Sequence, residues 1–97
     1  MSYEIQFVSS ANDQLNGFEA TERKGIVAAI EEQLLNEPQV ETRNRKRLRP
    51  NPLAPWELRV GNVRVFYDVG EPAKVTILAI GTKDRNKLYI GGKEIQL

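Results

Sequence analysis

Two arginine residues, Arg59 and Arg64, flank the dipeptide Gly61-Asn62 within two stretches in which apolar and polar residues alternate. Such a dipeptide between two alternating stretches is typical of a β-hairpin with a two-residue loop. The hairpin places Arg59 directly opposite Arg64, with their Cβ atoms about 5 Å apart. Like charges in this position destabilise a sheet, but a phosphate group between them would be bound by both. The pair therefore indicates a phosphate site made of surface charges, with neutralisation by Glu57 and Asp68 as the structural alternative.

The opposite face of the same hairpin is expected to belong to the core. Its residues are apolar or aromatic, and they pair across the hairpin as Val60 with Val63, Leu58 with Val65 and Trp56 with Tyr67. Because side chains alternate between the two faces of a strand, this register fixes both arginines on the other face.

The chain of 97 residues contains no cysteine and no histidine. This composition excludes thiolate and imidazole metal sites, disulfides, and Ser-His-Asp or Cys-His nucleophiles, and we expect neither a metal nor another cofactor. Any catalysis would use carboxylates, lysine, arginine, tyrosine or the backbone. The length is that of one domain, residues 1–97.

The formal net charge of +1 conceals an uneven distribution of charge along the chain. Residues 1–42 carry eight acidic and two basic side chains, whereas residues 43–97 carry twelve basic and five acidic ones. Such a division favours contact between one surface and a polyanion, although an ordinary mixed surface is the alternative. The acidic half is expected to be mainly a solvated helix face.

A run of five basic residues begins the basic half and consists of Arg43, Arg45, Lys46, Arg47 and Arg49. Three prolines follow within six residues, at positions 50, 52 and 55. Since proline excludes helix and central strand, we expect residues 42–55 to form an exposed, stiff connection. The basic run is predicted to contact nucleic acid or an acidic partner.

The remaining elements follow from apolar periodicity. Alternation predicts a strand over 3–8, and helical spacing predicts helices over 10–17, capped by Ser9 or Ser10, and from Thr21 to Asn36. A buried strand over 75–80 is expected to end at Gly81, and residues 88–90 and 94–97 to form edge strands or a loose tail. The predicted fold is α+β, with an N-terminal strand and a two-helix hairpin packed on a mostly antiparallel twisted sheet.

Neither a secretory leader nor an apolar stretch long enough to span a bilayer is visible, so we expect a cytoplasmic protein without membrane contact.

The segments Leu58–Tyr67 and Ile80–Arg85 together resemble the RelE/ParE superfamily of bacterial type II toxin–antitoxin systems, with the RelE branch favoured. The resemblance covers essentially the whole chain. It implies a RelE-like fold, a cognate antitoxin that is acidic and partly disordered when free, and ribosome-dependent cleavage of messenger RNA that inhibits translation. ParE-like inhibition of DNA gyrase without nuclease activity, or an inactive member that only binds its antitoxin, are the alternatives. Whether the chain forms a homodimer is left open by the sequence.

The resemblance also implies roles for individual residues. Arg64 matches the family arginine on the scissile phosphate, Arg59 a neighbouring basic position, and Tyr89 a tyrosine that stacks on or polarises the nucleotide. Lys83 replaces a second catalytic arginine, with Arg85 two residues later, and Glu57 replaces a proposed lysine base. The basic run and Lys87 would then contact ribosomal RNA.

Metal-independent cleavage requires a base for the ribose 2′-OH, cations for the phosphorane, and an acid for the leaving oxygen. Arg59 and Arg64 would supply the cations, and Lys83 or Arg85 the acid. The base would be Glu57, Tyr89 or a lysine among neighbouring cations.

Overall fold

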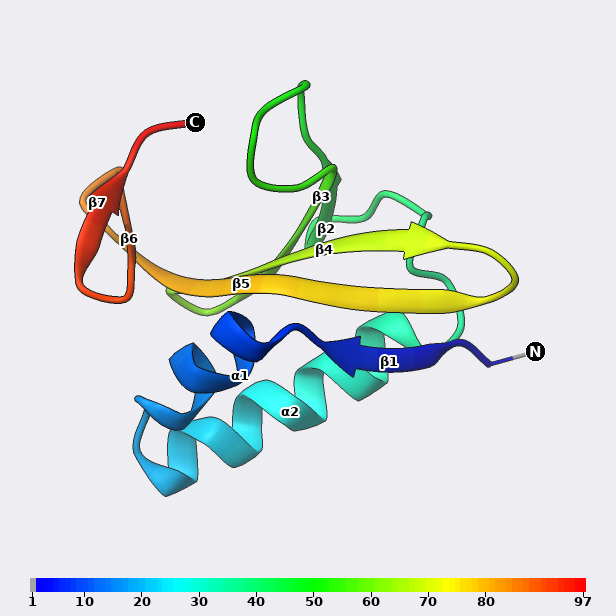
Figure 1. Ribbon diagram of the computed structural model, residues 1–97, viewed down its shortest axis with the longest axis horizontal. Coiled ribbons are helices and arrows are strands. Elements are labelled where there is room, and N and C mark those ends of the chain that lie inside the picture. The colour runs from blue at the N-terminus through cyan, green and yellow to red at the C-terminus, as the bar shows by residue number, and fades with distance from the viewer. Residues whose placement is uncertain (1) are drawn as a thin grey trace.

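The computed structural model describes residues 2–97, which form two helices and seven strands. The helices are α1 (Ser9–Asn16) and α2 (Ala20–Leu34). The strands are β1 (Glu4–Phe7), β2 (Arg45–Arg47), β3 (Trp56–Val60), β4 (Val63–Gly70), β5 (Lys74–Asp84), β6 (Lys87–Ile90) and β7 (Lys93–Ile95). Both helices lie on one side of the sheet (Figure 1).

The sheet has the strand order β2-β3-β4-β5-β6-β7, and β1 pairs with β5. The β1–β5 pair is parallel, while the other pairs are antiparallel. The expected α+β architecture, with a two-helix hairpin on a mostly antiparallel sheet, is therefore confirmed.

The main core lies between the helices and the sheet. Ile26, Ile30 and Leu34 are spaced four residues apart in α2, so their side chains fall on one side of the helix and are buried. They pack in one cluster with the sheet residues that the hairpin register assigned to this face, Trp56, Leu58, Val63, Val65 and Tyr67. This prediction is confirmed.

Three predicted details are wrong. Ser9 and Ser10 are the first residues of α1 rather than its cap, since the N-cap position is Val8 and no side chain caps the helix. β5 continues through Gly81 to Asp84. The segment after Thr42 is more than a connection, because Arg45–Arg47 form β2 and pair with Trp56–Leu58 of β3.

The proline-containing loop after β2 has an internal framework built on Asn51. The Asn51 amide group donates to the carbonyl oxygens of Arg49 and Ala54, at 2.7 and 2.9 Å. Its oxygen accepts from the backbone N–H groups of Leu53 and Ala54, at 2.8 and 3.0 Å. The loop is stiffened by one side chain as well as by its prolines.

The sheet face turned away from the helices carries a second, smaller apolar cluster, which the sequence analysis did not identify. Its buried residues are Ala54, Phe66, Ala79 and Leu88. The loop after β2 and the β6–β7 hairpin both rise on this side of the sheet, and the C-terminus points from the hairpin toward the loop (Figure 1). The partly buried residues Leu48, Leu53, Leu78, Ile90 and Ile95 pack against this cluster.

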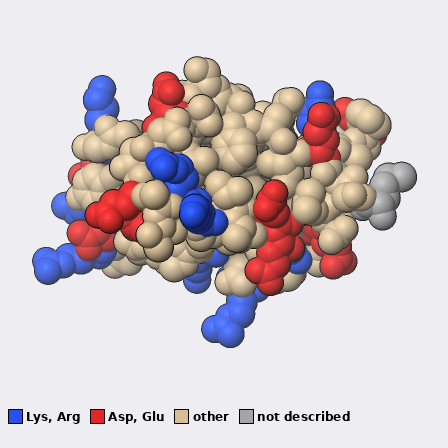
Figure 2. All heavy atoms as spheres, turned by 90° about the horizontal axis from the view of Figure 1, so that it is seen from below, with Lys and Arg blue, Asp and Glu red and all other residues tan. Residues whose placement is uncertain are grey.

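The side on which the helices lie carries acidic and basic side chains close to one another (Figure 2). The acidic excess of residues 1–42 consequently does not make a uniformly acidic face in this view. Among residues 2–97, no helix is long and apolar enough to cross a membrane.

Candidate active site

Arg59 of β3 and Arg64 of β4 are direct partners in the sheet, as the hairpin register predicted. We call the side of the sheet that carries them, away from the helices, the arginine face. Arg59 is exposed there, but Arg64 retains only 9% of its accessible surface. The expectation of two surface charges is therefore wrong for Arg64.

Arg64 is buried because it holds the hairpin turn. Its Nη1 donates to the carbonyl oxygens of Gly61 and Val63, at 2.7 and 3.1 Å. Its Nε is buried and has no hydrogen-bond partner within residues 2–97. A buried N–H group without an acceptor costs free energy, because it has lost its hydrogen bonds to water.

Glu57 is the acidic group next to this pair. Its Oε1 lies 4.0 Å from Nε of Arg64, and both side chains are largely buried. Burial lowers the pKa of the Arg64 guanidinium, the charge of Glu57 raises it, and that of Arg59 lowers it. Of the two acids considered for neutralisation, Asp68 instead accepts from the backbone N–H of Val69 at 2.8 Å.

Lys83 joins the same region from β5. Its backbone N–H donates to the carbonyl oxygen of Asn62 at 2.7 Å, which fixes this part of β5 against the hairpin loop. Lys83 and Glu57 line one hollow of about 460 Å³, whose other walls are formed by Asn86, Lys87, Leu88, Glu94, Ile95, Gln96 and Leu97. The structure thus brings together Arg59, Arg64, Glu57 and Lys83.

Two other candidates lie apart from this group. Tyr89 pairs with Thr82, which pairs with Val63. Val63 belongs to the core under the helices, so the register places Tyr89 on the face opposite Arg64. Arg85 occupies the β5–β6 turn with a φ of 51°, beyond the strand that carries Lys83.

The residues of the basic run differ in how far their side chains are buried. Arg45, predicted to contact RNA, is 8% exposed. Its Nε donates to the Val40 carbonyl oxygen at 2.8 Å, and its Nη1 donates to the Gln33 carbonyl oxygen at 2.7 Å and to Gln33 Oε1 at 3.1 Å. The expectation of exposure is wrong for Arg45, because this side chain ties β2 to α2. Arg43 and Arg49 are exposed.

Lys46 and Arg47 continue the alternation of β2. The Arg47 guanidinium lies over the Trp56 ring, 5.6 Å from its centroid. Lys46 is the direct partner of Glu57. Because neighbouring residues on a strand face opposite sides, Lys46 belongs to the arginine face. Sequence reasoning missed this placement since the pairing of β2 with β3 is not visible in the run itself.

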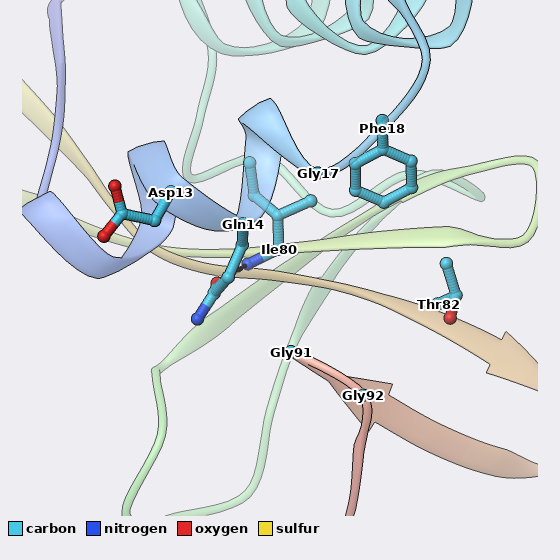
Figure 3. Close-up of a pocket in the computed structure, with 8 residues that line it drawn as sticks. All are labelled: Asp13, Gln14, Gly17, Phe18, Ile80, Thr82, Gly91 and Gly92. Carbon is cyan, nitrogen blue, oxygen red and sulfur yellow. Dashed lines mark hydrogen bonds between the residues drawn. The ribbon is translucent and has the colours of Figure 1, made fainter.

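A second hollow lies elsewhere, between α1 and the β6–β7 turn (Figure 3). Its volume is about 430 Å³, and Phe18 and Ile80 contribute its apolar walls. Gln14 Oε1 accepts from the backbone N–H of Ile80 at 2.8 Å at its base. None of the candidate site residues lines this hollow. The part of the chain that the structure describes contains no acidic cluster suited to a metal ion.

No family model matches the sequence, and no curated protein matches it. The fold, however, resembles that of a chain in the crystal structure of the toxin–antitoxin complex RelBE2 from Mycobacterium tuberculosis. The TM-score is 0.70 at 22% sequence identity, and the match covers 86% of this chain and 100% of that chain. This likeness confirms the predicted RelE-like fold.

Proposed function

We propose that this chain is the toxin of a type II toxin–antitoxin pair and that it cleaves messenger RNA on the ribosome. The observation that carries the proposal is the gathering of Arg59, Arg64, Glu57 and Lys83 on one face. These groups supply the functions required for cleavage by the ribose 2′-OH: cations for the phosphorane, a proton acceptor and a proton donor. The likeness to a chain of a toxin–antitoxin complex supports it.

In the proposed reaction the phosphate binds between the two arginines. The exposed Arg59 binds a phosphate oxygen, and Arg64 contributes its positive charge from the partner strand. Glu57 accepts the proton of the 2′-OH as the bond from the 2′-oxygen to phosphorus forms. Lys83 donates a proton to the 5′-oxygen as the bond from phosphorus to that oxygen breaks. The products are a 2′,3′-cyclic phosphate and a 5′-hydroxyl.

The ribosome would supply the orientation that this small site lacks. Arg49 and Lys87 line hollows of the arginine face, Arg43 is exposed just before β2, and all three would bind ribosomal RNA through its phosphates. Arg45 is not part of this contact, since its guanidinium is bound within the protein. By holding messenger RNA against the two arginines, the ribosome would orient the scissile phosphate and so accelerate its cleavage.

The arginine face is also the surface we assign to the antitoxin. Partly buried apolar residues such as Leu48, Leu53 and Ile95 lie on it, and basic residues flank them, Lys46 and Arg49 on one side and Lys83 and Lys87 on the other. An amphipathic segment with acidic side chains would place its apolar side on these residues and pair with the cations. Such a segment would cover Arg59 and block the phosphate site.

The experiment is translation of a reporter in a cell-free system, with mapping of the 5′ ends of the messenger. The wild type should generate new 5′ ends within the reading frame, and only on translated messenger. Arg59→Ala tests the site because Arg59 is exposed, and Lys24→Ala on the exposed surface of α2 is the matched control. An intact messenger together with arrested growth would refute nuclease activity.

One observation favours the alternative of gyrase inhibition. Tyr89 lies on the face opposite Arg64, which weakens the support for the nucleotide contact that the family resemblance implied for it. A supercoiling assay with purified gyrase separates the two functions. Inhibition of supercoiling by the wild type, with messenger left intact, would establish the alternative.

A further inference from the structure

The backbone of β2 is held on both sides, which fixes the position of the residue at its centre. The Arg45 side chain binds α2 and the carbonyl oxygen of Val40. Thr42 Oγ1 accepts from the backbone N–H groups of Asn44 and Arg45, both at 3.1 Å. At the other end, the backbone N–H of Leu48 donates to the carbonyl oxygen of Pro55 at 2.8 Å. Lys46 therefore extends from a rigid strand.

The two residues next to Lys46 are turned to the other face. Arg45 binds Gln33 of α2, and Arg47 stacks on Trp56, which belongs to the core under the helices. The alternation of side chains along a strand then directs Lys46 toward the arginine face. Its direct partner across the sheet is Glu57, whose carboxylate lies 4.0 Å from Nε of Arg64.

Distance permits Lys46 to reach the phosphate site. Lys46 on β2 lies two strand spacings of about 4.8 Å from Phe66 on β4, and Arg64 is two residues farther along β4. The backbones at Lys46 and Arg64 are therefore about 12 Å apart. The Glu57 side chain lies between them on β3. A lysine side chain is long enough to bring its ammonium group over Glu57 and toward a phosphate held by Arg64.

The positions of two hollows on this face support the placement of Lys46 near the phosphate site. Lys46 lines a hollow of about 520 Å³ next to the loop after β2, and Glu57 and Lys83 line the hollow of about 460 Å³. Leu97 lines both. The two hollows are therefore neighbours on the arginine face, and Lys46 lines one while Lys83 lines the other.

We propose that Lys46 is a catalytic residue of the arginine face, whose ammonium group contacts the reacting phosphate and accelerates the cleavage step. This assignment rests on the proposed nuclease function and removes Lys46 from the ribosome-binding run. It distinguishes Lys46 from Arg43, which is exposed outside the strand and serves binding alone. A cation at the reacting phosphate stabilises the transition state more than the bound substrate, so it raises the rate of cleavage. A cation that contacts ribosomal RNA stabilises the bound complex and the transition state equally, so it affects binding alone.

The test is single-turnover cleavage of messenger on programmed ribosomes, measured over a series of toxin concentrations. Lys46→Met should lower the rate at saturating toxin by about 10- to 100-fold and leave the half-saturating concentration within about twofold. Lys24→Met on the exposed surface of α2, the control, should leave both quantities unchanged, and Arg43→Met should raise the half-saturating concentration. Lys46→Arg should restore most of the rate, since it keeps the charge.

The outcomes separate the two proposals. If the wild type does not cleave, the proposed function fails and this assignment fails with it. If the wild type cleaves and Lys46→Met changes only the half-saturating concentration, Lys46 is a ribosome contact and the assignment alone is overturned. The midpoint of urea denaturation should be the same for wild type and Lys46→Met, because Lys46 is exposed. A lowered midpoint with an unchanged saturating rate would make Lys46 a structural residue and overturn the assignment.

Discussion

Arg59 and Arg64 are direct partners across β3 and β4, yet they stand in opposite environments, Arg59 exposed and Arg64 only 9% exposed. Arg64 uses Nη1 to bind the carbonyl oxygens of the hairpin turn, and its Nε beside Glu57 has no hydrogen-bond partner among residues 2–97. Arg64 therefore contributes to the stability of the hairpin turn, whereas Arg59 does not. The repulsion between them is offset at Arg64 by the nearby carboxylate.

This difference predicts opposite effects of the two alanine substitutions on stability. Arg64→Ala removes two hydrogen bonds to the turn and leaves Glu57 without its partner, so the free energy of unfolding should fall by about 1–3 kcal/mol. Arg59→Ala removes an exposed charge and should change it by less than about 0.5 kcal/mol. Urea denaturation followed by circular dichroism measures both. Equal effects of the two substitutions would contradict the assigned environments.

Arg45 is predicted to be the basic residue of the run on which folding depends. Arg45→Met removes three hydrogen bonds and leaves the carbonyl oxygens of Val40 and Gln33 without this donor. The expected loss is about 2–4 kcal/mol, because three hydrogen bonds of a charged donor are lost together at a partly buried site. Arg43→Met, in the same run but exposed, should change stability by less than about 0.5 kcal/mol. A denaturation midpoint for Arg45→Met that equals the control would show that Arg45 is not held as described.

The sequence was sufficient for the parts of the fold that local patterns determine. The Gly61-Asn62 loop and the alternation around it fixed the β3–β4 register, including the opposition of Arg59 and Arg64. The helical periodicity of Ile26, Ile30 and Leu34 likewise identified the buried side of α2.

Features that depend on pairing between distant segments could not be predicted in this way. The pairing of β2 with β3 decides that Arg45 is buried and that Lys46 faces Glu57, and a run of like charges gives no sign of it. The placement of Tyr89 depends in the same way on β6 pairing with β5. The burial of Arg64 depends on carbonyl groups of the turn, which only the folded backbone positions.

Gly81 is predicted to be required for the close approach of β6 to β5. A Cβ atom at Gly81 would overlap the carbonyl oxygen of Tyr89 and lie 2.7 Å from Cγ1 of Ile90. Gly81→Ala should therefore lower the free energy of unfolding by about 1–3 kcal/mol, since backbone would have to move. Gly25→Ala in α2 is the control, because nothing lies within 4 Å of its Cβ position. That substitution should raise stability by up to about 1 kcal/mol. A neutral Gly81→Ala would refute the close approach.

Tyr67 is predicted to make stability depend on pH in the alkaline range. Its hydroxyl donates to the Pro38 carbonyl oxygen at 2.6 Å, and the side chain is fully buried. Burial raises the pKa of this phenol well above its ordinary value of 10.0, against a smaller opposing effect of the Arg45 charge. The folded state therefore holds the proton more tightly than the unfolded state. The stabilisation is complete below pH of about 10 and is lost as the pH rises toward the raised pKa, by up to about 1.4 kcal/mol per pH unit.

Tyr67→Phe isolates this contribution from that of the other titrating groups. At pH 7 the variant should be about 1–3 kcal/mol less stable, because the Pro38 carbonyl oxygen loses its donor. Above pH of about 10 the wild type should lose stability more steeply than the variant, so the difference between them narrows. Urea denaturation of both proteins at several values between pH 7 and pH of about 12 measures the difference. If it stays constant over that range, Tyr67 loses its proton as readily in the folded as in the unfolded chain, which is incompatible with a buried phenol bound to a carbonyl oxygen.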